Sequence, residues 1–230
     1  MAKNLEQLRQ SLIAQFPGKT ITQSYLRLER NLNGITTSTN YSFDILQTDS
    51  ANGTVSALEK RLNTSDVFCA TAMCMYIYKA GTSATTVTDL ERANATLNTF
   101  PNALVYTTAG EAAALQVLYQ GAIRHAVNRV IYHDFDLDTE RFYRVGQAQR
   151  GVIGGTGGTA TNASQWDDAN YGFIGLEPTI SFGGLSQNEI SIKLPAATSL
   201  AGTSSSNYLV LYYRGFKIQG AAAEFQMRNI

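Results

Sequence analysis

The stretch that decides the fold is GAIRHAVNRVIYHDFDLDTERFYRV, residues 121–145. With a period of two, Ile123, Val127 and Ile131 fall on one face of an extended chain. The i, i+3, i+4 and i+7 spacing of an amphipathic helix fits this stretch poorly, and β-branched and aromatic residues dominate it. The stretch therefore predicts one long strand, or two strands joined by a corner near residues 134–138.

Segments on both sides repeat this strand signature. They are residues 21–29, 35–46, 66–79, 188–194 and 208–219. The first two flank an Asn-Leu-Asn-Gly turn at residues 31–34 and are candidates for a hairpin. Residues 66–79 are apolar almost throughout, which predicts a central strand covered on both faces. Gly215, inside the last segment, is a candidate β-bulge.

Helical segments are few. Residues 3–16 are the best candidate, ended by the Pro-Gly pair that follows. The apolar stripe of this helix consists of Leu5, Leu8, Leu12 and Ile13. Residues 1–18 form either an arm that docks on a neighbouring subunit or an internal membrane, or a helix lying on its own domain. Shorter helical segments are expected within residues 55–62, 90–97 and 112–119.

Length and pattern together predict the fold class. A chain of 230 residues fits one sizeable domain with a self-sufficient core. About ten strand-like segments with few helices indicate an all-β fold, a jelly-roll-like β-sandwich with an N-terminal helix and one or two short helices. We expect an N-terminal helical arm over residues 1–18 and a single β-sandwich or jelly-roll domain over residues 19–230.

The charge composition argues against a generally electrostatic partner. Lys and Arg number 18 and balance 18 Asp and Glu, so no global field favours nucleic acid or an anionic membrane. The charged fraction is 16%, below the usual ~25%. A low-charge surface rich in Thr, Ser and Asn suits a protein packed against copies of itself, and an ordinary neutral surface is the alternative interpretation.

The cysteines and the apolar runs indicate the compartment. Cys69 and Cys74 fall on one predicted strand, pointing to opposite faces about 16 Å apart, which is beyond disulfide reach. We therefore expect two reduced, buried thiols in a protein made in a reducing cytoplasm. The N-terminal residues lack the apolar segment of a secretory signal, and no run of about eighteen apolar residues predicts a membrane span.

Three carboxylates at alternate positions are the one candidate metal site. Asp134, Asp136 and Asp138 share a face if they lie on a strand, and in a loop they would converge on a hard cation such as calcium. The sixth and twelfth positions of a calcium-binding loop are here Thr139 and Val145, so its glycine and bidentate glutamate are missing. A solvated acidic corner near the following arginines is the preferred interpretation.

No constellation for catalysis is visible, and we expect no enzymatic activity and no small-molecule substrate. His125 and His133 would lie about 26 Å apart on a straight strand, too far to share one metal. The glycine-rich residues 151–162 lack the Lys-Ser/Thr ending of a phosphate-binding loop.

Two aromatic features suggest binding. In residues 212–217, YYRGFK, aromatic and basic side chains interleave, as in surfaces that stack on single-stranded nucleic acid, although an alternating core strand is the preferred interpretation. A carbohydrate-binding β-sandwich would need exposed aromatic side chains around a groove, and Trp166 and Tyr171 are the candidates.

Several segments of the chain resemble virion structural proteins, specifically capsid proteins of tailless icosahedral bacteriophages. They are residues 58–77, 96–106, 118–131, 137–151, 188–195 and 208–219. The resemblance implies a capsid subunit that self-assembles into an icosahedral shell, with copies of itself and other virion proteins as partners, located in the virion. Membrane-containing phages of this kind build shells from two fused jelly rolls per subunit. This chain is too short for two, which implies a single roll or a minor component.

Two other classes of protein remain open at this point. A tailed-phage capsid or decoration protein would share the low charge and the oligomeric habit but adopt a different α/β fold. A carbohydrate-binding β-sandwich module is the second alternative.

Overall fold

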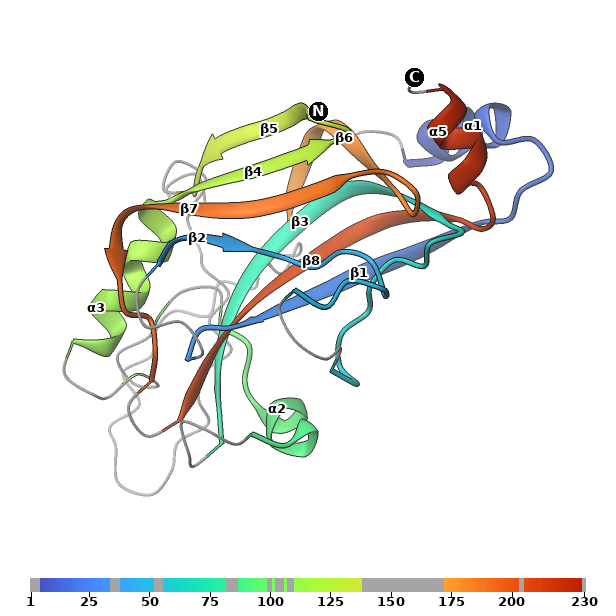
Figure 1. Cartoon of the computed structure of the whole chain (residues 1–230). Helices are drawn as coiled ribbons and strands as arrows, with labels where there is room; N and C mark the ends of the chain where they lie inside the picture. Colours follow the sequence, from blue (N-terminus) through green and yellow to red (C-terminus); the bar gives the residue numbers. More distant parts are fainter. Residues whose placement is uncertain are drawn as a thin grey trace.

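Two four-stranded antiparallel sheets make up the centre of the molecule (Figure 1). The computed structural model describes residues 5–33, 38–51, 56–81, 87–98, 101, 106, 110–137, 172–202 and 205–228. Among them the first sheet has the order β1-β8-β3-β6 and the second the order β2-β7-β4-β5. The strands are β1 (Ile21–Asn31), β2 (Ser38–Ser42), β3 (Val67–Ala80), β4 (Ala122–Val127), β5 (Val130–Asp136), β6 (Ile174–Gly183), β7 (Asn188–Thr198) and β8 (Ser206–Ile218). The predicted β-rich class is confirmed.

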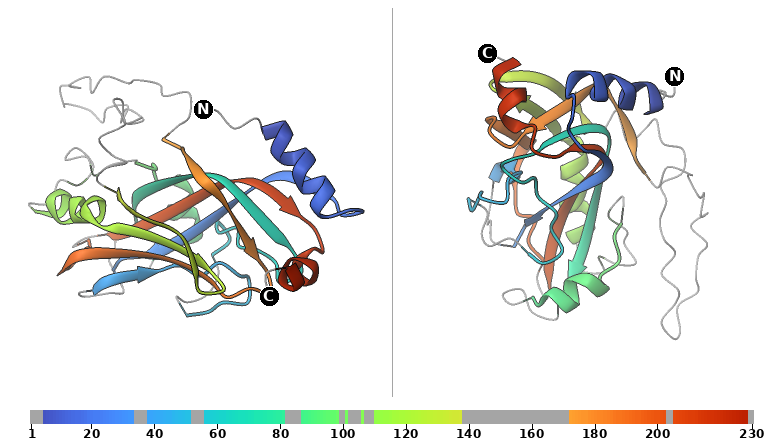
Figure 2. Two further views of the ribbon diagram at one scale, coloured as in Figure 1. Left: turned by 90° about the horizontal axis from the view of Figure 1, so that it is seen from above. Right: turned by 90° about the vertical axis from the view of Figure 1, so that its right-hand side faces the viewer.

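The strand pairs are nested around the middle of the chain. β4 pairs with β5, β3 with β6, β2 with β7 and β1 with β8, all antiparallel. The pairs β3·β8 and β4·β7 then complete the two sheets. The described chain therefore runs out and back as one long double ribbon, which is divided between two layers (Figure 2).

The core lies between the two layers because alternate side chains of each strand point inward. Inward residues of the first sheet include Leu28 in β1, Ile77 in β3 and Leu211 in β8, and all are buried. The second sheet contributes Ile123 in β4 and Ile192 in β7 to the same cluster. The predicted central strand at residues 66–79 and the half-buried strand at 188–194 are both confirmed as β3 and β7.

The described part of the stretch at residues 121–145, which ends at residue 137, forms two strands, but they do not meet where the sequence suggested. The chain reverses at Asn128 and Arg129, which both have positive φ (50° and 67°), and not at residues 134–138. Positive φ at both central residues is the requirement of a tight type I′ hairpin turn. Neither residue is glycine, and Asn128 is the one residue here whose type favours such a turn.

Two further local predictions are corrected. β1 and β2 do not form a hairpin, because β1 pairs with β8 in the first sheet and β2 with β7 in the second. Of the short helical turn expected within residues 55–62, the structure shows a single turn at residues 57–58, where Glu59 N donates to Ser56 O at 3.0 Å. The residues that follow form no helix but isolated bridges, such as that of Lys60 to Arg27.

A β-bulge in β3 changes which face its residues occupy. Ala70 pairs with Gly215 and Ala72 with Arg214, which leaves Thr71 as an extra residue. The sequence predicted a bulge at Gly215 in β8. The bulge is present at this position, but its extra residue, Thr71, lies in the partner strand β3. Because the bulge shifts the alternation by one, Cys69 and Cys74 lie on the same outer face of the sheet, and not on opposite faces as predicted. Both are buried free thiols.

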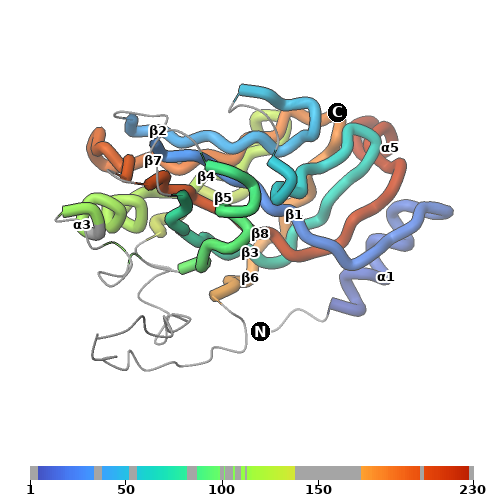
Figure 3. The backbone as a smooth tube through the Cα atoms, turned by 90° about the horizontal axis from the view of Figure 1, so that it is seen from below, coloured from blue at the N-terminus to red at the C-terminus, as the bar shows by residue number. Residues whose placement is uncertain are grey.

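Helices lie at the two ends of the sandwich (Figures 1 and 3). α1 (Leu5–Gln15) and α5 (Ala222–Arg228) share one end, and α3 (Glu111–Gln116) with the 3-10 helix η1 (Val117–Gln120) lies at the other. α2 (Asp89–Asn94) packs beside β3. The expected helices at 3–16, 90–97 and 112–119 are thus present, and α5 was not anticipated.

α1 rests on the outer face of the first sheet. Leu12 and Phe16 are buried in a cluster with Val67, Phe216 and Ile218. Leu5 and Ile13 are 47% and 41% exposed, so only half of the predicted apolar stripe is covered by the chain itself. The interpretation of a helix lying on its own domain accounts for the covered half.

Candidate functional site

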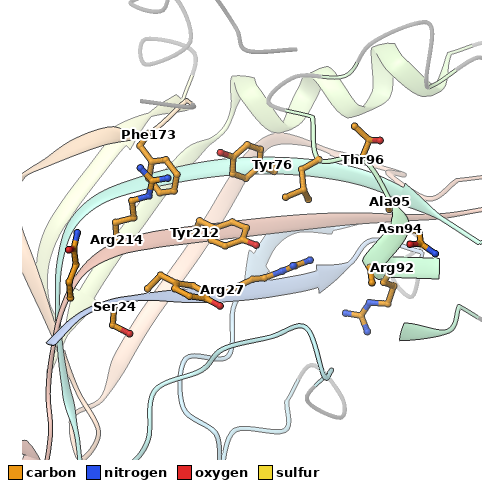
Figure 4. A pocket seen from close by; sticks show the side chains of 14 residues that line it. Ser24, Arg27, Tyr76, Arg92, Asn94, Ala95, Thr96, Phe173, Tyr212 and Arg214 are labelled. Atoms are coloured by element: carbon orange, nitrogen blue, oxygen red, sulfur yellow. The ribbon is translucent and has the colours of Figure 1, made fainter. Parts of the chain in front are cut away.

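A groove of about 1060 Å³ lies on the outer face of the first sheet (Figure 4). Its floor is formed by β1, β8 and β3, and side chains from adjacent strands project from the sheet into it. The lining residues are Gln23, Ser24, Tyr25, Arg27, Tyr76, Arg92, Ala93, Asn94, Ala95, Thr96, Leu97, Phe173, Tyr212 and Arg214. Among these, aromatic and arginine side chains predominate over apolar aliphatic ones.

Strand register places the aromatic and basic side chains of the floor next to one another. Tyr25 is directly opposite Arg214, and Arg27 is directly opposite Tyr212. The diagonal pair Tyr25 and Tyr212 has ring centroids 6.1 Å apart and tilted by 33°. Tyr76 meets Tyr212 edge to face at 5.7 Å, so a row of three tyrosine rings crosses three strands.

One wall of the groove is the segment from residue 87 to 98. Asn98 is bridged to Ile77 of β3 through both backbone hydrogen bonds, and α2 begins with a capping box between Thr88 and Glu91. This cap satisfies free N–H groups at the start of a six-residue helix and so fixes the position of Arg92. Phe173 forms another part of the lining, with the Arg214 guanidinium 3.7 Å from its ring centroid.

A buried carboxylate under the groove holds two of its arginines. The Glu29 side chain is 2% exposed and pairs with Arg27 at 2.5 Å and with Arg92. Tyr78 Oη donates a hydrogen bond to Glu29 Oε2 at 2.9 Å, and Arg92 Nε donates to Tyr78 Oη at 3.1 Å. Two guanidinium groups thus share one carboxylate, and Arg92 Nη1 also lies 3.5 Å from Asp89 Oδ1, so that two carboxylates face these two arginines.

The surroundings shift the pKa values of two tyrosines and one arginine of the groove. Burial raises the pKa of Tyr76 and of Tyr212 above the ordinary value. Burial by itself would lower the pKa of Arg92. The hydrogen bond to Tyr78 and the charge of Glu29 outweigh this effect, so the pKa of Arg92 is raised above its ordinary value. Arg214 is exposed, and among the described residues no carboxylate forms an ion pair with it.

The predicted acidic cluster is only partly placed. Asp134 and Asp136 are exposed on β5, two residues apart, and Asp138 lies outside the described residues. Arg124 on the neighbouring strand pairs with Asp134 at 2.8 Å. Within the described ranges no group of three or more His, Cys, Asp or Glu residues is placed to hold a metal ion. The calcium site therefore stays a prediction.

The two histidines are brought together, contrary to the expected separation of about 26 Å. His125 and His133 face each other across the β4–β5 hairpin, with ring centroids 5.4 Å apart. Both are buried between the sheets, and His125 Nε2 is 2.7 Å from the Tyr213 hydroxyl. Burial, and then the neighbouring His133, lower the pKa of His125 to about 3. This pair belongs to the core, and the long straight strand assumed from sequence does not exist.

The other aromatic predictions divide between core and groove. In residues 212–217, Tyr213 is fully buried between the sheets and Phe216 is covered by α1, whereas Tyr212 and Arg214 line the groove. Trp166, Tyr171 and the glycine-rich residues 151–162 lie outside the described residues. The alternation Tyr25-x-Arg27 in β1 is the sequence signal that would have completed the groove.

Comparison of the chain with protein-family models, with curated proteins and with solved structures finds no match. None of the described helices has the length and hydropathy needed to cross a bilayer. The candidate site therefore rests on the geometry alone.

Proposed function

We propose that the chain is a virion structural protein, a capsid subunit that assembles with copies of itself into an icosahedral shell. The observation that carries this proposal is the nested pairing of eight strands, β1·β8, β2·β7, β3·β6 and β4·β5, divided into two four-stranded sheets. A double ribbon wrapped in this way is the plan of a jelly roll, a fold found in viral capsid and lectin domains. A tailed-phage capsid protein would show an α/β fold instead.

A fold alone does not specify a function, so the proposal also needs a surface suited to self-association. β5 is the outermost strand of the second sheet, paired on one side with β4. Its first residues, Val130, Ile131 and Tyr132, are 57%, 51% and 37% exposed. Soluble proteins commonly protect an edge strand with charges, and consecutive exposed apolar side chains favour contact with another chain.

The uncovered side of α1 is a second candidate contact. Leu5 and Ile13 face outward while Leu12 holds the helix on its own domain. In an assembled shell this side would pack against a neighbouring subunit, another virion protein or an internal membrane.

Size and shape of the purified full chain test the proposal. We expect size-exclusion chromatography with light scattering, together with negative-stain electron microscopy, to show oligomers or closed particles. Ile131→Lys should reduce assembly because it places a charge on the β5 edge. Leu90→Lys, at a side chain 71% exposed on α2, is the matched control and should assemble as the wild type does. A monomer at high micromolar concentration contradicts a capsid role.

The groove favours one alternative, a carbohydrate-binding β-sandwich module. Its exposed Tyr25 ring and the polar lining residues Gln23, Asn94 and Thr96 are groups that sugar-binding surfaces use. A monomer that is retarded by a neutral polysaccharide in affinity electrophoresis would support the module and oppose the capsid subunit.

A further inference from the structure

The groove is larger than a site for one small molecule requires. Its volume of about 1060 Å³ lies just above the ~300–1,000 Å³ typical of small-molecule pockets. It lies across three adjacent strands, from Tyr25 in β1 to Tyr76 in β3. A site of this form suits a segment of an extended polymer.

The positively charged side chains that line the groove favour an anionic polymer as its ligand. Arg27, Arg92 and Arg214 line the groove, and no aspartate or glutamate is among its described lining residues. Glu29 below the floor pairs with Arg27 and Arg92, and Asp89 also pairs with Arg92. Among the described residues, the remaining excess of positive charge comes from Arg214 and from Lys60, whose Nζ lies 4.0 Å from the ring centroid of Tyr25. The balanced net charge of the whole chain conceals this local excess.

The tyrosine rings that line the groove favour a polymer with planar groups that can stack on them. Tyr25 is 45% exposed, and its ring continues through Tyr212 to Tyr76 along the floor. Arginines lie beside these rings at intervals that follow the strand register, so that stacking faces and cations alternate. Single-stranded nucleic acid presents this combination, with bases for the rings and phosphates for the guanidinium groups.

We propose that the groove on the outer face of β1, β8 and β3 binds single-stranded nucleic acid, with Tyr25 and Tyr212 as stacking platforms and Arg214 as a phosphate contact. Arg27 and Arg92 are held in place by Glu29, and Arg92 also donates to Tyr78 and Asp89, so these two arginines shape the groove beside the rings. The proposal does not depend on the capsid function, because it concerns the isolated subunit.

Fluorescence anisotropy with a labelled oligothymidylate of about 16 nucleotides tests the proposal, with the full chain titrated into a nanomolar concentration of the probe. We expect Tyr25→Leu to weaken binding by about tenfold. Arg214→Gln should also weaken binding, and it should reduce the slope of log K against log salt by about 0.7, the loss of one phosphate contact. As controls, Tyr132→Leu removes one ring and Lys193→Gln one charge from the second sheet. Both should leave the affinity and its salt dependence unchanged.

Each other outcome overturns the proposal. If the full chain does not bind oligothymidylate, the groove is not a site for single-stranded nucleic acid. Equal weakening by the groove variants and the second-sheet variants would show that the nucleic acid uses another surface. If dextran sulfate binds as tightly as the oligonucleotide and Tyr25→Leu weakens neither, the groove recognises charge alone and its ligand is an anionic glycan. Circular dichroism and thermal melts of all four variants establish that the loss of binding is not a loss of fold.

Discussion

Gly215 in β8 lies directly against the backbone carbonyl of Cys69 in β3, where an added Cβ would be 1.9 Å from the oxygen. The contact arises because Gly215 faces the bulge at Thr71, where the two central strands approach more closely than in a regular ladder. No flexible side chain is available to yield at this point, since the opposing atoms are backbone. The absence of a side chain is therefore a requirement of the central strand pair.

We expect Gly215→Ala to lower the free energy of unfolding by about 3 kcal/mol or more, the upper range for overpacking in a well-packed region. Gly175→Ala in β6 is the matched control, because a Cβ added there would meet no atom within 4 Å. Its effect should stay within about 0.5 kcal/mol. Urea denaturation of both variants measures the difference, and equal stabilities would mean that the two strands separate easily here.

Acid should destabilise the fold through His125. Its folded-state pKa of about 3 lies below the ordinary value of 6.5, so the unfolded chain binds the additional proton first. The contribution of His125 to stability is complete above pH 6.5 and is lost as the pH falls toward 3, by at most about 1.4 kcal/mol per pH unit. Urea midpoints between pH 7 and pH 5, where few carboxylates titrate, measure this slope. His125→Gln should flatten it, and an unchanged slope would assign the acid sensitivity to other groups.

Glu29→Gln should destabilise the protein because Arg27 and Arg92 would lose their shared carboxylate. We expect a loss of about 2–3 kcal/mol, below the ~3–5 kcal/mol typical of broken fully buried pairs, because both arginines keep some access to water. Glu189→Gln, on an exposed position of β7, is the control and should be close to neutral. Chemical denaturation compares the two variants, and similar values would mean that Glu29 contributes no net stability.

The two sides of α1 should respond differently to truncation. Leu12→Ala removes a buried side chain and should cost about 2–3 kcal/mol of unfolding free energy. Ile13→Ala, at an exposed side chain, should leave the stability within about 0.5 kcal/mol of the wild type. If α1 also serves as an arm, Ile13→Ala should reduce the oligomer fraction in light scattering. A stable Leu12→Ala protein would argue that the helix is not anchored on its own domain.

The acidic residues of β5 give a prediction about metal removal. Because Arg124 already neutralises Asp134, we expect EDTA to change neither the assembly size nor the melting temperature. Asp136→Asn should likewise leave both unchanged. A fall in either quantity that calcium reverses would establish the metal site that the sequence pattern suggested.

Two strands with one or both faces buried, β3 and β7, could be identified from the sequence alone. Alternation in β7 and the continuous apolar run of β3 predicted both strands, because burial on one or two faces fixes the side-chain pattern directly. The apolar stripe at Leu12 indicated a helix for the same local reason.

Which strands pair with one another could not be predicted from the sequence, because paired strands such as β1 and β8 lie far apart along the chain. The groove needs Tyr25 beside Arg214, two residues that only the β1–β8 register brings together. Two local features change which side chains share a face of a sheet: the turn at Asn128 and Arg129, and the bulge at Thr71. Neither the turn nor the bulged residue is marked by a glycine. The separation of the histidines and the faces of the cysteines were wrong for this reason.

The nested pairing also sets an order of events during synthesis. The β4–β5 hairpin closes over a two-residue turn and can form as soon as it is made, whereas Ile21 must wait for Ile218. At ribosomal rates of about 5–20 residues per second, β1 stays without its partner for about 10 to 40 s. Throughout that interval its row of unpaired N–H and C=O groups is open to strands of other nascent chains. Crowded polysomes are therefore the place where this topology is most vulnerable to misassembly.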